Sequence, residues 1–270
     1  NKDIPFPGYD KLTDEMNEKP ASIILTIKDS QGNHIRNVKK NASNGSSRIA
    51  WNLRHQSYYP VRAGRAQANS WFNPSGPYVT PGDYSAEIYL ENNGSIEKLD
   101  GPISFTVKPL REGTLKGASY DDYNSFRSRI SSLYVEVSKY QDEFNMMKSK
   151  VELLEKASLQ LETFSPEIIK KISDFKAKYN AFDSQTGGNP ARSEIGEWDK
   201  PTISMRIQIA MQGLSTSYGP TDLNKSNLDI AERLFKKLAS DVKVFKSELE
   251  LLENEVKELN PPHLSGSGIN

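Results

Sequence analysis

The sequence predicts an α+β protein of two domains, an antiparallel β-sandwich followed by an antiparallel helical bundle. Three observations support this fold class. Apolar and polar residues alternate in short runs between Ala21 and Arg111, as they do in strands with one buried face. Apolar residues then recur every three or four positions over two long stretches, as they do in packed helices. The length of 270 residues suits two domains.

Residues 1–20 precede the first alternating run. They contain Pro5, Pro7, Gly8 and Pro20, each of which disfavours a continuing helix. We therefore expect an extended lead-in or linker before the first domain.

Residues 21–111 carry the strand pattern. Each run is short, rich in β-branched or aromatic residues and bounded by turn residues. The expected strands are 22–28, 34–38, 48–54, 84–90 and 103–107. Trp51 should face the core, and Asn93-Gly94 is a two-residue hairpin turn. Short strands at this spacing predict a sandwich about the size of an immunoglobulin-like domain.

Residues 112–270 carry the helical pattern. A first long helix is expected from Tyr120 to about Thr163. A last one, capped by Thr221-Asp222, is expected to run to about Leu259. The first has apolar positions at Phe126, Ile130, Leu133, Val137, Tyr140, Phe144, Met147, Val151, Leu154 and Leu161, with Ser158 as the one exception. The last has them at Leu228, Ala231, Phe235, Leu238, Val242, Phe245, Leu249, Leu252, Val256 and Leu259. Each helix needs partners to bury this seam.

Two shorter helices lie between the long ones. One starts at Pro166 after the cap residue Ser165, and the other follows Pro201. Residues 183–201 are rich in Gly and Pro, so we expect an exposed loop there. The two short helices would form one interrupted middle helix of a three-stranded bundle.

The long seams could also join two molecules. Short connections and the bulky residues Tyr140, Phe144, Phe235 and Phe245 favour packing within one chain. We therefore favour a monomer and leave the oligomeric state open.

Composition argues against several functional classes. Lys and Arg together number 35, as do Asp and Glu, so there is no basic excess for nucleic acid. No apolar run is long enough to span a membrane. Cysteine is absent, and His34, His55 and His263 are far apart. We expect no metal site, no cofactor and no cysteine or histidine chemistry.

Acidic residues give no catalytic pair either. Glu194, Glu197 and Asp199 form the densest cluster, close to Trp198. A glycosidase requires two carboxylates that face each other across the scissile bond. We expect these loop residues to be solvated charges, and Asp121-Asp122 to interact with the N-terminus of a helix. No catalytic residue is predicted.

A segment between the strands, residues 55–80, is unusually aromatic. Its candidate binding or interface residues are Tyr58, Tyr59, Trp71, Phe72 and Tyr78. Exposed aromatic rings on a loop can stack on sugar rings or anchor a protein partner. They can equally pack onto the bundle or the edge of the sandwich. We favour packing, and both alternatives stay open.

The strand region also resembles a known family. The motifs are Asp29-x-x-Gly32-x-x-Ile35-Arg36, Arg48-Ile49-Ala50-Trp51-Asn52-Leu53-Arg54, Pro81-Gly82-Asp83-Tyr84 and Phe105-Thr106-Val107-Lys108-Pro109-Leu110-Arg111. In this order they resemble the Ig-like domain near the C-terminus of bacterial exported proteins with sortilin-type or BNR-type β-propellers. Many of those proteins are labelled putative glycosyl hydrolases. The unit is also similar to the Ig-like domain of flagellar hook-capping proteins.

The resemblance covers residues 20–111 by motif and the rest by layout only. Asn52 stands where the family usually has Asp, and Leu110 interrupts the usual ending. The resemblance implies an exported protein, periplasmic or extracellular, with a domain upstream in the same polypeptide. It implies that any hydrolase activity belongs to the propeller.

These observations predict a non-catalytic accessory region that organises or docks an upstream propeller. One alternative is a carbohydrate- or protein-binding module that uses the aromatic loop. Another is part of a glycosyl hydrolase whose site lies elsewhere.

Overall fold

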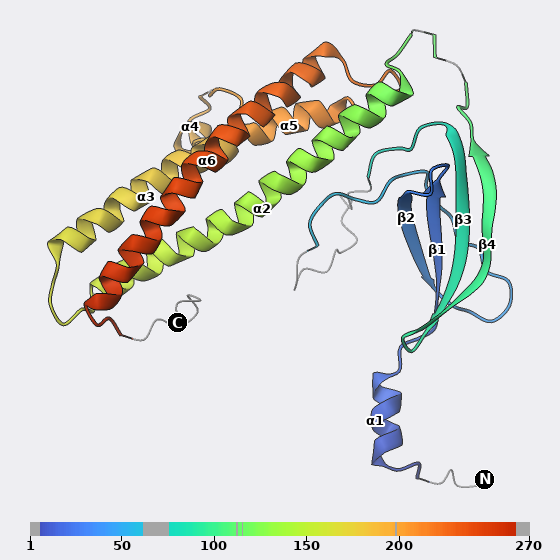
Figure 1. Cartoon of the computed structure of the whole chain (residues 1–270), viewed down its shortest axis with the longest axis horizontal. Coiled ribbons are helices and arrows are strands. Elements are labelled where there is room, and N and C mark those ends of the chain that lie inside the picture. Colours follow the sequence, from blue (N-terminus) through green and yellow to red (C-terminus); the bar gives the residue numbers. More distant parts are fainter. Residues whose placement is uncertain (1–5, 62–75, 112, 115, 198, 263–270) are drawn as a thin grey trace. The chain divides into compact units, whose positions relative to one another are not determined.

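A computed structural model describes residues 6–61, 76–111, 113–114, 116–197 and 199–262. These residues contain an antiparallel sheet and several helices, which confirms the prediction of a mixed α+β chain. They divide into two compact units (Figure 1). The sheet unit takes the described residues up to Ser57 and those from 76 to 114. The helical unit takes 58–61 and those from 116 onward.

The sheet unit is built on four antiparallel strands in the order β2-β1-β3-β4. The strands are β1 (Ser22–Asp29), β2 (His34–Asn41), β3 (Gly82–Asn92) and β4 (Ser95–Val107). Asn93 and Gly94 join β3 to β4 with φ angles of 48° and 84°, which confirms the predicted hairpin turn. One face buries the core residues Ile27, Ile35, Val79 and Tyr84. The described residues contain this one sheet.

The predicted strand at 48–54 is wrong. Leu53 has a φ of 56°, which strands do not adopt, and Arg54 makes only an isolated bridge with Tyr78. Trp51 still packs on the sheet, with its ring 5.7 Å from that of Tyr84 and 6.0 Å from that of Phe105. The alternating pattern therefore marks an irregular segment in which Trp51 packs on the sheet while Leu53 is exposed.

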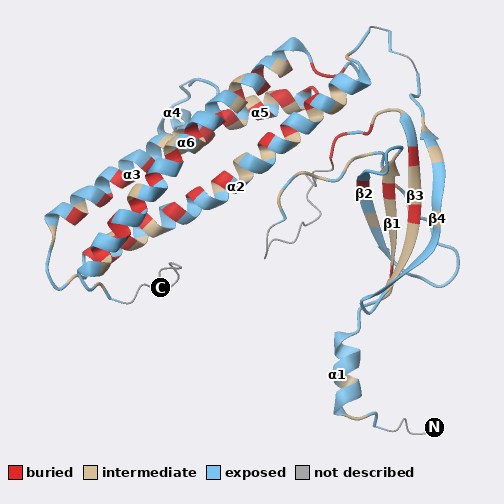
Figure 2. Ribbon diagram, in the orientation of Figure 1, coloured by how far each residue is buried: buried red, intermediate tan, exposed pale blue. Residues whose placement is uncertain are grey.

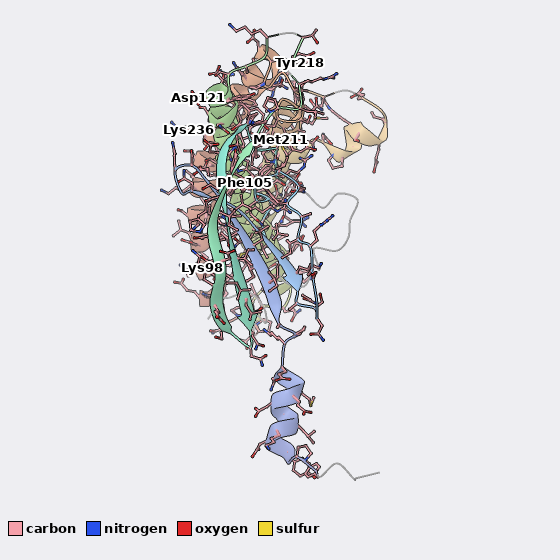
Figure 3. All side chains as sticks on the ribbon, turned by 90° about the vertical axis from the view of Figure 1, so that its right-hand side faces the viewer. Lys98, Phe105, Asp121, Met211, Tyr218 and Lys236 are labelled. Carbon is pink, nitrogen blue, oxygen red and sulfur yellow. The ribbon has the colours of Figure 1, made fainter. Side chains whose placement is uncertain are left out.

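The opposite face of the sheet carries a charge cluster. Glu87, only 8% exposed, accepts hydrogen bonds from Lys28 at 2.6 Å, Lys98 at 2.8 Å and the hydroxyl of Tyr89 at 3.1 Å. Figure 3 marks Lys98 and Phe105 on β4. The bonds from Lys28, Lys98 and Tyr89 favour the ionised form and lower the pKa of Glu87 to about 2.

The predicted extended lead-in is also wrong in part, because Tyr9–Asn17 forms helix α1. The helix-breaking residues Gly8 and Pro20 lie outside it, so nothing in the intervening residues prevents helix formation. None of its residues is buried, as the pale blue ribbon in Figure 2 shows.

The helical unit contains α2 (Tyr120–Ser158), α3 (Pro166–Gly187), α4 (Pro190–Glu194), α5 (Ile203–Gln212) and α6 (Asp222–Glu258). Residues of α2, α3, α5 and α6 share one core, visible as red stripes in Figure 2. All the predicted seam residues of α6 are buried except Leu259, which lies beyond the helix and is 37% exposed. None of the described helices is both long and apolar enough to cross a membrane.

Ion pairs show the relative directions of α2, α3 and α6. Arg129 on α2 pairs with Asp229 on α6 at 2.6 Å, and Lys150 pairs with Glu253 at 3.0 Å, so the two long helices run parallel. Lys171 on α3 pairs with Glu255 at 2.6 Å, and Lys178 further along α3 pairs with Glu248 at 2.6 Å. α3 therefore runs antiparallel to α6. Figure 1 shows α3 and α5 following one another beside α6.

The helix starts agree with the predicted caps. The hydroxyl of Ser165 accepts a hydrogen bond from the backbone of Ile168, and Thr221 forms a capping box with Asn224. Two expected boundaries are wrong. α2 ends at Ser158, before Thr163, and the buried hydroxyl of Ser158 donates to the carbonyl of Glu155 at 2.8 Å.

The expected loop at 183–201 is the second wrong boundary. α3 continues to Gly187, since Asp183 and the buried Thr186 extend its helical turns and only Gly188, with a φ of 93°, ends them. A separate short helix, α4, then begins after the cap residue Asn189. The Gly and Pro residues of segment 183–201 therefore interrupt the helical structure over fewer residues than predicted.

The seam of α6 allows a direct test. Leu238 is fully buried, so Leu238→Asp places an unpaired carboxylate in the core. We expect the free energy of unfolding of the helical unit to fall by about 3–5 kcal/mol. Chemical denaturation followed by circular dichroism measures the loss. Lys246→Asp, at an exposed position of the same helix, is the control. Equal stability of both variants would contradict the placement of Leu238.

Glu87 predicts a pH dependence. Its pKa is lower in the folded chain than in the unfolded chain, so its contribution is fully present above about pH 4.5 and is lost as the pH falls towards 2. Glu87→Gln should lower the melting temperature at pH 7. The difference from the parent should shrink steadily between pH 5 and pH 2. Melting curves across this range measure it, and a constant difference would show that the ionised carboxylate is not the stabilising group.

Candidate functional site

Three tyrosines form a cluster in the helical unit. The rings of Tyr58 and Tyr59 stack at 5.4 Å, and both contact Tyr134 of α2 edge-on, at 5.3 and 4.8 Å. Burial, reinforced by Tyr59 and Tyr134, raises the pKa of Tyr58. Tyr59 stays 36% exposed. Tyr58 therefore anchors the segment to α2, and Tyr59 is the more exposed of the two tyrosines.

A groove of about 580 Å³ begins at Tyr59 and runs between α2 and α5. Such a volume is within the range of small-molecule sites, roughly 300–1,000 Å³. Its apolar lining comes from Val137, the buried Ile207 and Met211. Figure 3 labels Met211 on α5. The other lining residues are Tyr134, Ser138, Gln141, Ser204, Gln208, Gln212 and Ser215.

The polar side chains of this groove are neutral. None of the described residues that line it carries a charge. Within the described chain, the side-chain amides of Gln141, Gln208 and Gln212 make no hydrogen bond to other residues. Each amide offers two donors and an acceptor. The groove therefore combines an aromatic ring, an apolar lining and free amides.

Local sequence explains why α5 stands where it does. Asn224, 7% exposed, donates its side-chain amide to the carbonyl of Ile209 at 2.6 Å and accepts from the hydroxyl of Thr221 at 2.6 Å. A Cβ atom at Gly213 would lie 3.0 Å from the side chain of Asn224, so glycine permits this close approach. The end of α5 is thereby fixed to the start of α6, and its other side faces α2.

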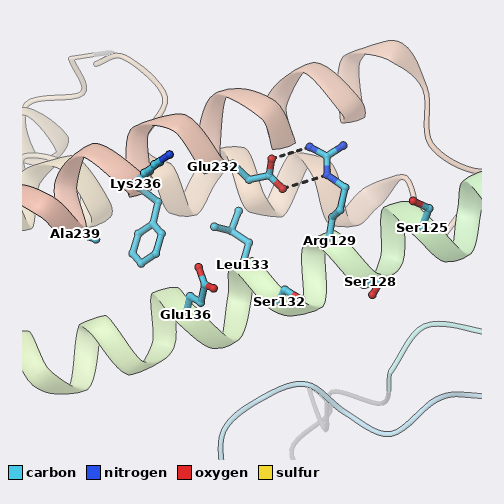
Figure 4. Close-up of a pocket in the computed structure, with 10 residues that line it drawn as sticks. Ser125, Ser128, Arg129, Ser132, Leu133, Glu136, Glu232, Lys236 and Ala239 are labelled. Atoms are coloured by element: carbon cyan, nitrogen blue, oxygen red, sulfur yellow. Dashed lines mark hydrogen bonds and ion pairs between the residues drawn. The ribbon is translucent and has the colours of Figure 1, made fainter. Parts of the chain in front are cut away.

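A second groove, of about 760 Å³, lies between α2 and α6 (Figure 4). Its lining is charged, and Arg129 binds Glu232 at 2.7 Å as well as Asp229. This pairing holds the pKa of Arg129 above its usual value. The Arg129 guanidinium is therefore held by α6, and the charged residues Glu136 and Lys236 also line this groove.

The structure separates the five aromatic candidates. Tyr58 and Tyr59 join Tyr134 in the helical unit, whereas Tyr78 belongs to the sheet unit, where the guanidinium of Arg54 lies 3.7 Å from the centre of its ring. Trp71 and Phe72 lie outside the described residues. A single binding surface made of all five is therefore not what the described residues form.

The acidic candidates have simple partners. Arg192 lies 3.4 Å from Asp199 and 4.0 Å from Glu197. Asp121 and Asp122 occupy the first turn of α2, as expected, and Ser119 caps the same turn. Among the described residues, no group of three or more acidic, histidine or cysteine side chains could hold a metal ion.

Sequence reasoning missed most of the groove. Tyr134 stands next to the seam residue Leu133 but outside the seam, and an aromatic ring at such a position is a usable signal. Gln208 and Gln212 are four residues apart and therefore share one face of α5. No pattern in the sequence pairs α5 with Tyr59.

Comparison with known proteins adds no relationship. No protein-family model, curated protein or solved structure matches this chain.

Proposed function

We propose that this chain is a non-catalytic binding module whose groove between α2 and α5 takes a neutral carbohydrate. The observation that carries the proposal is the combination of the Tyr59 ring with the free amides of Gln141, Gln208 and Gln212. The C–H face of a sugar ring stacks on an aromatic ring. Its hydroxyls donate and accept hydrogen bonds, as amides do. The role assigned to this chain is binding and not turnover.

The uncharged lining supports a neutral ligand. An acidic sugar or a phosphate would gain from Arg or Lys, which are the usual partners of anions. A cationic ligand would gain from carboxylates. The described residues of this groove provide neither, so hydrogen bonding and stacking are left to supply the affinity.

A proline-rich peptide is the main competitor, because such segments also bind grooves lined by aromatic rings. Such a peptide presents mostly carbonyl acceptors. It would leave the acceptor oxygens of Gln141, Gln208 and Gln212 without donors, whereas sugar hydroxyls satisfy both ends of each amide. Hydrogen bonding therefore favours the sugar.

The wider context is part of the same proposal. The sequence motifs support an Ig-like sandwich at 21–111, and Trp51 packed on Tyr84 and Phe105 is consistent with a covered sheet. The seams and ion pairs support a three-stranded bundle at 112–270, with α3 and α5 as its interrupted middle helix. The family resemblance supports an accessory region of an exported protein, attached to an upstream domain.

Tyr59→Ala tests the groove. The chain is first screened against neutral and charged oligosaccharides, and titration calorimetry then gives the affinity for the best neutral ligand. We expect the variant to bind at least about tenfold more weakly, or about 1.4 kcal/mol, with little change in melting temperature. Tyr120→Ala, an exposed tyrosine of α2 outside the groove, should bind like the parent.

Three results would count against the proposal. One is a preference for charged over neutral sugars, and a second is sugar binding that survives Tyr59→Ala. The third is tighter binding of a proline-rich peptide than of any sugar, lost in Tyr59→Ala, which would assign the groove to peptides.

A further inference from the structure

Helix α6 carries a second apolar stripe that its own unit leaves uncovered. Leu223, Val244 and Leu251 are 66%, 58% and 65% exposed, and Ile230 is half-buried. They are spaced by multiples of seven residues, with Lys237 at the remaining position. Residues seven apart lie on nearly the same side of a helix. The stripe spans 28 residues, or about 42 Å.

This stripe is distinct from the core seam. The residues of α6 that pair with α2 are Asp229, Glu232 and Glu253. In the seven-residue repeat, the stripe lies on the opposite flank of the seam from these three. It is therefore on the side of α6 turned away from α2, the flank that also carries Glu248 and Glu255, the partners of α3.

The stripe is symmetric about Lys237. Leu223 and Leu251 are each fourteen residues from it, and Ile230 and Val244 are each seven. Two copies of α6 placed antiparallel with their Lys237 residues opposite would match leucine to leucine and isoleucine to valine. Such a self-matching surface is what a two-fold symmetric dimer requires.

Charge follows the same symmetry. Arg233 and Asp241 flank the centre, each four residues from Lys237. Within the described chain neither makes an ion pair. In the antiparallel arrangement Arg233 of each copy is opposite Asp241 of the other copy, so two such pairs form. The two Lys237 residues meet at the centre, where the Asp241 carboxylates, one turn away, offset their repulsion.

We infer that the partner of this stripe is a second copy of the chain, bound antiparallel along α6 with Lys237 at the two-fold axis. The apolar pairs provide the contact, and the Arg233–Asp241 pairs set the register and exclude the parallel arrangement, in which like charges would meet. The dimer replaces the monomer favoured from sequence. It leaves the α2–α5 groove of each copy unchanged.

A charge exchange tests the register. Arg233→Asp and Asp241→Arg each place like charges opposite one another, so each variant alone should dissociate at least tenfold more readily than the parent. A one-to-one mixture of the two variants restores both ion pairs, and so does the double variant. Sedimentation equilibrium of the full chain over a concentration series measures all four. Lys243→Asp, on the side of α6 next to α2, should dimerise like the parent.

Because the chain has no cysteine, single cysteines test the axis independently. Lys237→Cys should give a disulfide-linked dimer on mild oxidation, whereas Ser226→Cys should not, since its counterpart would lie far away in an antiparallel pair. Cross-linking through Ser226→Cys would indicate a parallel pair. The inference would be overturned by a parent chain that stays monomeric at every concentration. It would also be overturned if a one-to-one mixture of Arg233→Asp and Asp241→Arg dimerised no better than either variant alone.

Discussion

Burial of one narrow seam along α6 holds the helical unit together. Its buried residues, from Leu228 to Val256, meet α2 on one side and α3 and α5 on the other. Because α2 and α6 run parallel, the chain must return between them, and α3 and α5 make this return in two pieces. The ion pairs from Lys150, Lys171 and Lys178 to α6 lie at the edges of the seam. The pairs from Lys171 and Lys178 are exposed and contribute little, so apolar burial dominates.

The candidate site depends on this packing. A continuous middle helix would fill the space along α2, but the return is broken between Gly187 and Ile203. α5 is therefore a separate helix from α3. The contacts of Asn224 and Gly213 fix its position at the start of α6. The side of α5 that faces α2 carries glutamines and serines where a core helix would carry leucines. Tyr58 and Tyr59 pack at the end of this gap, on Tyr134. If two chains associate along α6, each pair carries two such grooves, and a repeating glycan could engage both with higher avidity.

The sequence predicted the elements that repeat and missed those that depend on distant contacts. The spacing of Phe235, Leu238 and Val242 is local, so it indicated the seam of α6, and the caps Ser165 and Thr221 were equally local. The segment 48–54 alternates like a strand, yet Leu53 adopts a positive φ. Alternation alone does not specify a strand, and an irregular segment that packs only Trp51 on the sheet can carry the same pattern.

Breaker residues misled the prediction in two places. Near α1 and α3, the Gly and Pro residues predicted longer non-helical segments than the structure has. Each such residue disrupts only the helical turn in which it lies. The groove could not be predicted, because Tyr59 and Gln208 are 149 positions apart and no periodicity connects them. Their proximity follows from tertiary packing alone.

The central claim is that neutral sugars bind between α2 and α5, and the side-chain amides of the glutamines report on it directly. A nitrogen-15 labelled chain is titrated with the best neutral oligosaccharide while two-dimensional NMR spectra record each amide. We predict that the side-chain signals of Gln141, Gln208 and Gln212 move together and saturate, while that of the exposed Gln160 on the same unit stays in place. Shifts confined to the sheet unit, or to residues of the α2–α6 groove, would contradict it.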